Sequence, residues 1–484
     1  MGPWCSVDVG RVLLNPSEPP EPRQTCGRGR GANTVSWRDS DKQQCKTPRG
    51  WVAGDVVRQC RRVGAPGPVV PCVRCLPHPH PLFGLRARAR TSSSWQTSSL
   101  ESAYKSAYKS ESALPPCPAL LFVRPTSQRH TQTHRHPYTH TMAADKIAPN
   151  DPRVERKQAE VRGKTYSYLY SKPEGTPKGT VVLIHGWPDI SLGWRYQIPF
   201  FLSLGYRVVA PDCLGYGQTS SPEKLEEWSL KSMSDDIKAL CDQIVPGEQI
   251  ILGGHDWGGA LVWRAAMWHP DLIKGVFSVC TPYSAPTTAW FDLADIIAAG
   301  HLTNFKYQLQ LRGPEVEEKL TKPEDIRQFL QGIYGGRGAN GELAFNTDRG
   351  VLFENLGKIG PTPLLSEEEI SYYTDNFVKS GMRGPVNWYR TRRINYDEEL
   401  PLAEKTAAEG GDYKVTPPSL FILASKDTAL PASMAAGMGK HFADLTRGEV
   451  TATHWALWEA PEEVNEQIKQ WIESKVDKKP TASL

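Results

Sequence analysis

Residues 249–270, QIILGGHDWGGALVWRAAMWHP, place a carboxylate where a nucleophile is expected. A strand-like apolar run leads into Gly254-His255-Asp256-Trp257-Gly258, and a helix-like run follows. This is the pattern of a nucleophile elbow, a sharp strand-to-helix turn that presents one side chain to a substrate. Asp256 holds the usual position of a serine. Because an aspartate has a pKa of about 3.9, it is ionised at neutral pH without help from a base. The alternative is that Asp256 only caps the helix.

A second aspartate and a histidine follow two later apolar runs. Asp427 ends the run SLFILASKD, and His454 ends the run GEVTATH. If both runs are parallel strands, both side chains lie at the sheet edge that carries Asp256. The order nucleophile, acid, histidine is that of α/β-hydrolases. A histidine with a pKa of about 6.5 can take a proton from water, and an acid beside it fixes its tautomer.

The motif HGWP, residues 185–188, follows the apolar run TVVLI. In such a fold, the loop at this place and the residue after the nucleophile donate backbone N–H groups to an oxyanion. We therefore predict an oxyanion hole made by the N–H groups of Trp187 and Trp257, with an ordinary strand-end turn as the alternative. The other histidines are interpreted as structural or as remote from a strand end: His185, His255, His269, His301 and His441.

The elements that must position these residues alternate between strands and helices. The predicted strands are GTVVLIHGW, RVVAPDCLGYG, QIILGGHD and GVFSVCTPY, with KTYSYLYSK as an exposed antiparallel strand. Helices are predicted for WRYQIPFFLSLGY, residues 230–244 and WGGALVWRAAMWHP. This alternation indicates a parallel α/β sheet. The rhythm stops after Tyr283. We expect residues 142–283 and 413–484 to form the core, and residues 284–412 to form a helical lid.

Residues 1–141 have a different composition. They carry 20 Lys and Arg against 8 Asp and Glu, whereas residues 142–484 carry 37 against 45. The first part is rich in Pro, Gly and Ser without a helix or strand period, which predicts a disordered extension or an over-extended gene model. Two motifs in it are interpreted as chance, because prolines separate the histidines and no apolar strand precedes the acidic pair. They are a zinc half-site (Cys72, Cys75, His78, His80) and a DxD pair (Asp39, Asp41).

The cysteines favour a reducing compartment, and we expect a cytoplasmic protein. Only Cys213, Cys241 and Cys280 follow Met142, too few and too widely spaced for a disulfide framework. No run of about 18 apolar residues predicts a membrane span, and the first residues lack the charged and apolar regions of a signal peptide. The acidic balance of residues 142–484 argues against nucleic acid as a partner.

The motifs resemble those of soluble epoxide hydrolases of the α/β-hydrolase superfamily. The resemblance rests on HGWPD, DCLGYGQTS, GGHDWGG, ASKD and THW, and it covers nearly all of residues 155–475. It implies a mostly parallel eight-stranded sheet flanked by helices, with a helical lid. The stretches FKYQL (305–309) and SGMRGPVNWYR (380–390) are similar to the segments that carry the family's epoxide-activating tyrosines. The resemblance thus assigns that role to Tyr307 and Tyr389, whereas Tyr334, Tyr372 and Tyr373 are expected to pack within the lid.

The resemblance also implies a reaction, the opening of an epoxide to a vicinal diol. Asp256 attacks an epoxide carbon while Tyr307 and Tyr389 protonate the oxygen, and His454 with Asp427 then activates the water that cleaves the ester. This reaction requires no metal and no organic cofactor, so we expect neither, and the absence of a Gly-rich phosphate loop agrees with that. The expected partner is an apolar epoxide, whether aryl, terpenoid or fatty-acid. The residues expected to bind it are Trp194, Gln308, Trp388 and Trp455.

Three other functions share some of these features. A haloalkane or haloacid dehalogenase would share Asp256, His454 and the elbow, but its lid would lack the tyrosine pair. A serine hydrolase requires a Gly-x-Ser-x-Gly motif, which this sequence lacks. A non-catalytic binding protein can keep the same fold. The sequence leaves the selectivity and the oligomeric state open, with a homodimer as one alternative.

Overall fold

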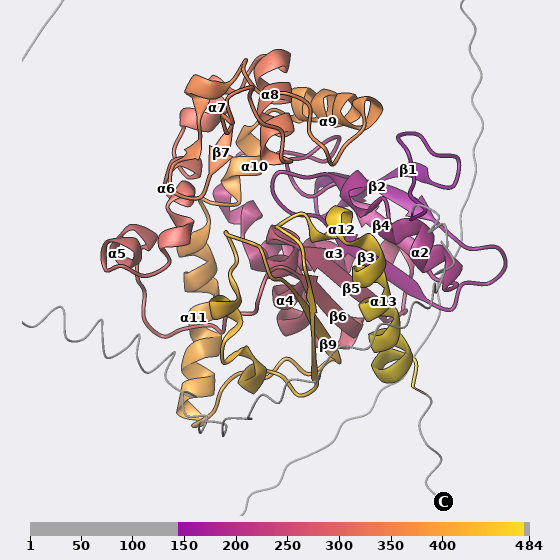
Figure 1. Cartoon of the computed structure of the whole chain (residues 1–484). Helices are drawn as coiled ribbons and strands as arrows, with labels where there is room; N and C mark the ends of the chain where they lie inside the picture. The colour runs from indigo at the N-terminus through magenta and orange to yellow at the C-terminus, as the bar shows by residue number, and fades with distance from the viewer. Residues whose placement is uncertain (1–143, 479–484) are drawn as a thin grey trace, which may run out of the picture. The chain divides into compact units, whose positions relative to one another are not determined.

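The computed structural model describes residues 144–478 (Figure 1). The predicted N-terminal extension, residues 1–141, therefore lies outside the described residues. The same is true of the zinc half-site at Cys72 and Cys75 and of the DxD pair at Asp39 and Asp41.

One eight-stranded sheet forms the centre of the described residues, with the strand order β1-β2-β4-β3-β5-β6-β9-β10. β2 pairs antiparallel with β1 and β4, and every other pair is parallel. The mostly parallel α/β sheet predicted from the sequence is thus confirmed. The strands are β1 (Glu155–Val161), β2 (Lys164–Ser171), β3 (Thr180–Ile184), β4 (Arg207–Pro211), β5 (Ile250–His255), β6 (Ile273–Val279), β9 (Ser419–Ala424) and β10 (Leu445–Val450).

The central strands are apolar because both of their faces are covered. All residues of β3 and β5 are buried, as expected for parallel strands between two helical layers. The prediction of an exposed strand at β2 was wrong, and β1 was not predicted. β2 is mostly buried. Lys164 Nζ, at the start of β2, lies 2.9 Å from Asp236 Oδ2, and the hydroxyl of Tyr166 donates to the same oxygen at 2.8 Å. Asp236 belongs to a helix that covers this face of the sheet.

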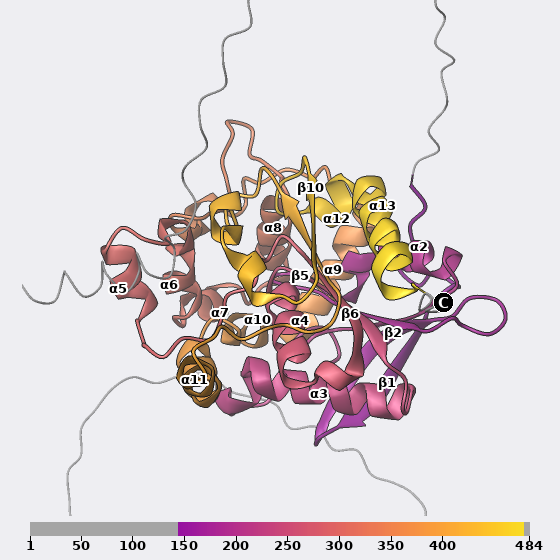
Figure 2. The same cartoon turned by 90° about the horizontal axis from the view of Figure 1, so that it is seen from below.

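Helices cover the two faces of the sheet (Figure 2). α3 (Leu230–Ile244) and α4 (Trp257–Trp268) lie on one face. α2 (Gln197–Ser203), α12 (Ala456–Glu459) and α13 (Pro461–Trp471) lie on the other. α3 spans the predicted residues and begins after Ser229, whose side chain accepts a hydrogen bond from the N–H of Ser232.

The residues between β6 and β9 form a further, mainly helical layer, and we call residues 284–412 the lid segment. Figure 1 shows α7–α10 together at the top of the view, with α11 descending beside the sheet. α9 begins with a capping box between Ser366 and Glu369. The elements are α5 (Leu293–Ala298), α6 (Tyr307–Leu311), α7 (Glu315–Lys319), α8 (Pro323–Ile333), β7 (Phe345–Asn346), β8 (Gly350–Val351), α9 (Glu367–Ser380), α10 (Arg383–Asn387) and α11 (Arg392–Ala408).

A buried ion pair fastens the lid segment to the core. Nε and Nη2 of Arg264, on α4, donate to the two carboxylate oxygens of Glu399, on α11, at 2.7 and 3.0 Å. Nη1 of Arg264 also donates to the carbonyl oxygen of Ser284 at 2.8 Å. Two parallel N–H···O bonds fix direction as well as distance. The lid segment is therefore attached in a fixed orientation to α4, the helix that follows the elbow.

Cys213, Cys241 and Cys280 are buried and form no disulfide with one another. Among residues 144–478, no helix combines the length and the apolar character that crossing a bilayer requires.

Candidate active site

Asp256 lies in the strained turn between β5 and α4. Its backbone has φ 53° and ψ −122°, which is uncommon for a residue other than glycine. The flanking glycines make the turn fit. A Cβ on Gly254 would lie 2.3 Å from the carbonyl oxygen of Gly258, and a Cβ on Gly258 would lie 2.0 Å from that of Ile184. The glycines thus let β5, α4 and β3 approach closely enough to present the carboxylate at the sheet edge.

The loop after β3 binds one oxygen of this carboxylate. The backbone N–H of Trp187 donates to Asp256 Oδ1 at 2.7 Å. Gly186 makes this approach feasible, because a Cβ there would lie 2.4 Å from the Cβ of Asp256. Within the described residues, the N–H of Trp257 makes no hydrogen bond to the carboxylate. The structure therefore brings the Trp187 half of the expected oxyanion hole into contact with Asp256, but not the Trp257 half.

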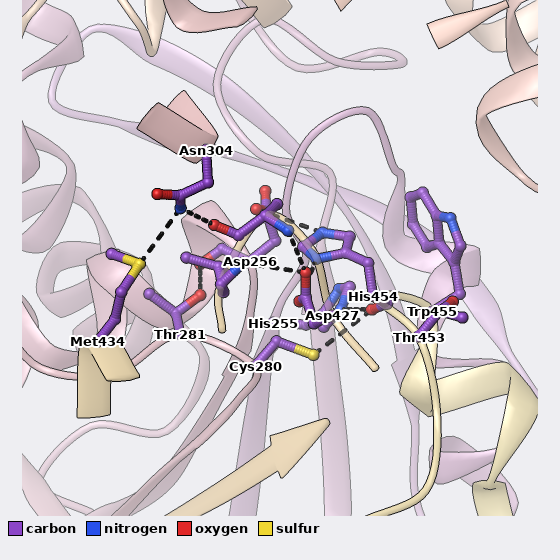
Figure 3. Close-up of polar contacts among 12 residues, drawn as sticks. His255, Asp256, Cys280, Thr281, Asn304, Asp427, Met434, Thr453, His454 and Trp455 are labelled. Carbon is purple, nitrogen blue, oxygen red and sulfur yellow. Dashed lines mark hydrogen bonds and ion pairs between the residues drawn. The ribbon is translucent and has the colours of Figure 1, made fainter. Parts of the chain in front are cut away.

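His454 lies between two carboxylates (Figure 3). Its Nδ1 lies 2.7 Å from Asp427 Oδ2, and its Nε2 lies 3.4 Å from Asp256 Oδ2. The other oxygen of Asp427 accepts hydrogen bonds from the backbone N–H groups of Ala429 and Leu430, at 2.8 and 3.0 Å. Asp427 follows β9 and His454 follows β10, so parallel strands bring together residues that are distant in sequence.

The charges of this cluster support one another. Burial would lower the pKa of His454, but the charge of Asp427 and hydrogen bonds with both carboxylates raise that pKa well above its usual value. Burial would likewise raise the pKa of Asp427, but the charge of His454 and the hydrogen bond with it lower that pKa to about 2. His454 is therefore protonated in the free protein and Asp427 is ionised.

Three residues that sequence reasoning did not assign to the site hold its backbone (Figure 3). His255 Nε2 lies 2.8 Å from the carbonyl oxygen of His454, and Cys280 Sγ donates to the same oxygen at 3.5 Å. Burial lowers the pKa of His255 to about 4, so its ring is neutral and donates Nε2–H to this carbonyl. The hydroxyl of Thr281 donates to the carbonyl oxygen of Asp256 at 2.6 Å. The sequence signal that could have indicated these residues is their position: His255 ends β5, and Cys280 and Thr281 directly follow β6.

The lid segment also contacts the loop that carries Asp427. Asn304 Nδ2 donates to the carbonyl oxygen of Ala429 at 2.6 Å, two residues after Asp427. No local pattern around Asn304 indicates this contact, which depends on how the lid segment folds over the core.

Tyr307 and Tyr389 lie together beside the elbow. Their ring centroids are 6.1 Å apart, and both side chains are buried. The ring of Tyr389 contacts those of Trp187 and Trp257 edge-on, with ring centroids 5.4 and 5.2 Å apart. Burial and then the charge of Asp256 raise the pKa of Tyr307, and burial, Tyr307 and Asp256 raise that of Tyr389. Both phenols therefore stay protonated at neutral pH and can donate.

The residues expected to bind substrate do not all reach this cluster. Gln308 Nε2 donates to the hydroxyl of Tyr307 at 3.3 Å. The ring of Trp388 lies 6.2 Å from that of Trp257, and the ring of Trp455 lies 5.3 Å from that of His454. Trp194 lies apart. It is fully buried, and its ring packs against Phe277 of β6, which makes it a core residue rather than a wall of the site.

His255, Cys280 and His454 bring three potential metal-ligating atoms within 4.8 Å of one another. Burial raises the pKa of the Cys280 thiol well above its usual value, so the thiol form dominates. A thiol is a poor ligand compared with a thiolate. The Nδ1 of His454 is already engaged by Asp427. In this structure the three groups make hydrogen bonds within the site: His255 and Cys280 to the carbonyl oxygen of His454, and His454 to Asp427.

The comparisons with known proteins agree with this geometry. A family model described as the α/β hydrolase fold matches residues 179–322. The epoxide hydrolase srdG of Neurospora crassa is 42% identical over 345 residues, covering 69% of this chain and 99% of that protein. The mouse bifunctional epoxide hydrolase 2 is 31% identical over 299 residues, covering 61% of this chain and 51% of its own length.

Solved structures of similar proteins cover the same part of the chain. The crystal structure of epoxide hydrolase A from Mycobacterium thermoresistibile has 26% identity and a TM-score of 0.55, and covers 66% of this chain and 99% of its own. An epoxide hydrolase of Vigna radiata has 25% identity and a TM-score of 0.54, with coverages of 66% and 98%. The chain therefore belongs to the epoxide hydrolases of the α/β-hydrolase fold.

Proposed function

We propose that the enzyme converts an epoxide and water to a vicinal diol through an ester of Asp256. The observation that carries this proposal is the row of contacts from the N–H of Trp187 through Asp256 and His454 to Asp427. This row gives the nucleophile a bound oxygen, a facing base and an acid behind that base. Such an arrangement suits covalent catalysis in two steps.

In the first step, Asp256 opens the epoxide. Oδ1 is bound by the Trp187 N–H, so Oδ2 is the oxygen available for attack. A bond forms between Oδ2 and an epoxide carbon, and the bond from that carbon to the epoxide oxygen breaks. Tyr307 and Tyr389 bind this oxygen, and one of them supplies the proton that makes it a hydroxyl. Their raised pKa values keep that proton available at neutral pH.

In the second step, His454 activates water. Ester formation removes the charge of Asp256, one of the two carboxylates that raise the pKa of His454. The pKa of His454 then falls, and its proton passes through solvent to the phenolate left by ring opening. The neutral ring can now act as a base, and Asp427 stabilises its protonated form. Water loses a proton to Nε2 and attacks Cγ of the ester. The Trp187 N–H binds the negative charge that develops on Oδ1. The bond from Cγ to Oδ2 then breaks, and Oδ2 takes the proton of the new carboxyl group. The diol leaves with Oδ2 as the Asp256 carboxylate reforms.

The surroundings favour an apolar epoxide as substrate. Aromatic rings of Trp187, Trp257 and Tyr389 meet at the elbow, and apolar surface of this kind binds ligands with few polar groups. The tyrosine pair and the epoxide hydrolases among the relatives favour an epoxide over an alkyl halide. We also propose a cytoplasmic location, on the basis of the three free cysteines.

The source of the diol oxygen tests the ester mechanism. With enzyme in excess over epoxide in ¹⁸O-water, the first diol should carry unlabelled oxygen, because that oxygen comes from Asp256. The label should appear in the peptide that contains Asp256. Multiple turnovers serve as the control and should yield labelled diol. Labelled diol from the first turnover would show direct attack by water and would rule out the ester.

A further inference from the structure

The loop that carries the Trp187 N–H is a tight turn, and we call residues 186–189 the oxyanion loop. The N–H of Asp189 donates to the carbonyl oxygen of Gly186 at 3.1 Å, which closes the turn. Asp189 Oδ1 accepts from the N–H of Ile190 at 2.8 Å, and the whole side chain is buried. The Trp187 N–H belongs to this turn, so contacts that other elements make with residues 186–189 bear on the same short segment.

Two tyrosines of the lid segment hold it. The hydroxyl of Tyr334, at the end of α8, donates to the carbonyl oxygen of Pro188 at 2.6 Å. The hydroxyl of Tyr373, in α9, donates to Asp189 Oδ1 at 2.7 Å. Both tyrosines are fully buried. A buried phenol needs a hydrogen-bond acceptor, and both of these take theirs from the same four-residue loop. This is more than the lid packing that the sequence suggested for them.

The same tyrosines contact the segment that carries the base. The ring of Tyr334 lies 4.8 Å from that of Trp455, the residue after His454, and Trp455 Nε1 donates to the carbonyl oxygen of Ile333 at 2.9 Å. Tyr334 and Tyr373 both pack on Trp458, at 5.1 and 6.3 Å. One aromatic cluster therefore joins the lid segment to the oxyanion loop and to the segment after β10.

We propose that Tyr334 and Tyr373 are positioning residues through which the lid segment aims the Trp187 N–H and so sets the rate of ester hydrolysis. The inference rests on the proposed ester of Asp256. Its signature is a difference between the two steps. Negative charge leaves the carboxylate during ring opening but develops on Oδ1 during hydrolysis. A misaimed N–H therefore slows hydrolysis and leaves ring opening unimpaired.

The test uses Tyr334→Phe and Tyr373→Phe, which remove each hydroxyl and keep each ring. Single-turnover experiments on the full chain, with quenching and mass spectrometry, give the rates of ester formation and ester decay separately. Each variant should slow ester decay about tenfold, the effect of one lost hydrogen bond, with ester formation within about twofold of wild type. Steady-state assays should show a lower kcat and accumulated ester.

The matched control is Tyr206→Phe. Tyr206 is a buried tyrosine whose hydroxyl donates to a carboxylate, Asp477 Oδ2, at 2.5 Å, as Tyr373 does to Asp189. It precedes β4 and so lies at the opposite edge of the sheet from Asp256. This variant should leave both steps unchanged. Asp189→Asn keeps an acceptor oxygen for Tyr373, so its ester should decay faster than the ester of Tyr373→Phe.

The outcomes separate the inference from the mechanism beneath it. If wild type forms an ester and both lid variants hydrolyse it at the wild-type rate, the inference is overturned and the ester mechanism stands. Equal slowing of both steps, or slowing in Tyr206→Phe, points to a general structural effect and also overturns it. If wild type forms no ester, the proposed ester mechanism is wrong, and the inference that rests on it is wrong as well. Thermal unfolding confirms that each variant is folded.

Discussion

The Nε2 atom of His454 lies 3.4 Å from Oδ2 of Asp256, the carboxylate oxygen that the oxyanion loop leaves unbound. In the proposed mechanism this contact holds the Asp256 carboxylate before attack. It weakens once Oδ2 becomes an ester oxygen, because that oxygen is then neutral. The proposal therefore implies that the imidazole is free to bind water in the second step and that the two steps depend differently on His454.

We therefore expect His454→Gln to form the ester but to hydrolyse it more than about 100-fold more slowly, the usual contribution of general-base catalysis. Intact-mass analysis after addition of an epoxide should show one substrate mass added to the protein. The double variant with Asp256→Asn is the control and should gain no mass. An unmodified His454→Gln protein would count against the separation of roles.

Replacing Tyr307 or Tyr389 should slow ring opening. In Tyr389→Phe or Tyr307→Phe one phenol remains, so the single-turnover rate of ester formation should fall by about 10- to 100-fold, and in the double variant by more. Tyr372→Phe is a matched control from the same lid segment, since its hydroxyl accepts from Arg156 Nη2 at 2.8 Å rather than facing Asp256. A rate of ester formation unchanged in Tyr389→Phe would remove this residue from the site.

The pH dependence of hydrolysis should move when Asp427 is neutralised. The charge of Asp427 raises the pKa of His454, so Asp427→Asn lowers that pKa. The neutral ring then persists to lower pH, and the acidic limb of ester decay should shift toward lower pH. The plateau rate should also fall, because the imidazolium loses its stabilising partner. The check is the rate of ester decay in wild type and variant across the pH range. An acidic limb at the wild-type position would contradict this.

The ion pair between Arg264 and Glu399 should contribute to stability as a pair. Arg264→Met leaves the buried carboxylate of Glu399 uncompensated, and we expect the free energy of unfolding to drop by about 3–5 kcal/mol. The double variant Arg264→Met with Glu399→Leu should recover much of that loss, because no charge is then buried alone. Denaturant unfolding measures both. A double variant as unstable as the single one would argue for a purely steric role.

The sequence predicted the features that local patterns encode. The elbow at Asp256 follows from small residues between a strand and a helix, and Asp427 and His454 follow strands of a parallel sheet. The limits have a physical cause. Trp194 is close in sequence to Trp187, but a short 3₁₀ helix, Ser191–Trp194, turns its ring into the core. Such a change of direction leaves no periodic signal.

Contacts made by the lid segment were likewise beyond local patterns. Tyr334 and Tyr373 have the composition of packing residues, and their hydroxyl acceptors lie 146 and 184 residues away in sequence. The same holds for Asn304, which reaches the loop of Asp427 from a different element. A residue's polar partner at such separations is a property of the tertiary fold.

The ion pair of Arg264 and Glu399 has a consequence for the modularity of the molecule. α4 begins beside Asp256 and carries Arg264 about two helical turns later, where α11 is attached. Asp256 and the residue to which the lid segment is attached thus lie at two points of one element, α4. A lid segment taken from a relative would have to fit Arg264 as well as the site, because a poor fit at Arg264 would act on the helix that begins beside Asp256. Recombination between relatives would therefore have to exchange α4 and α11 together.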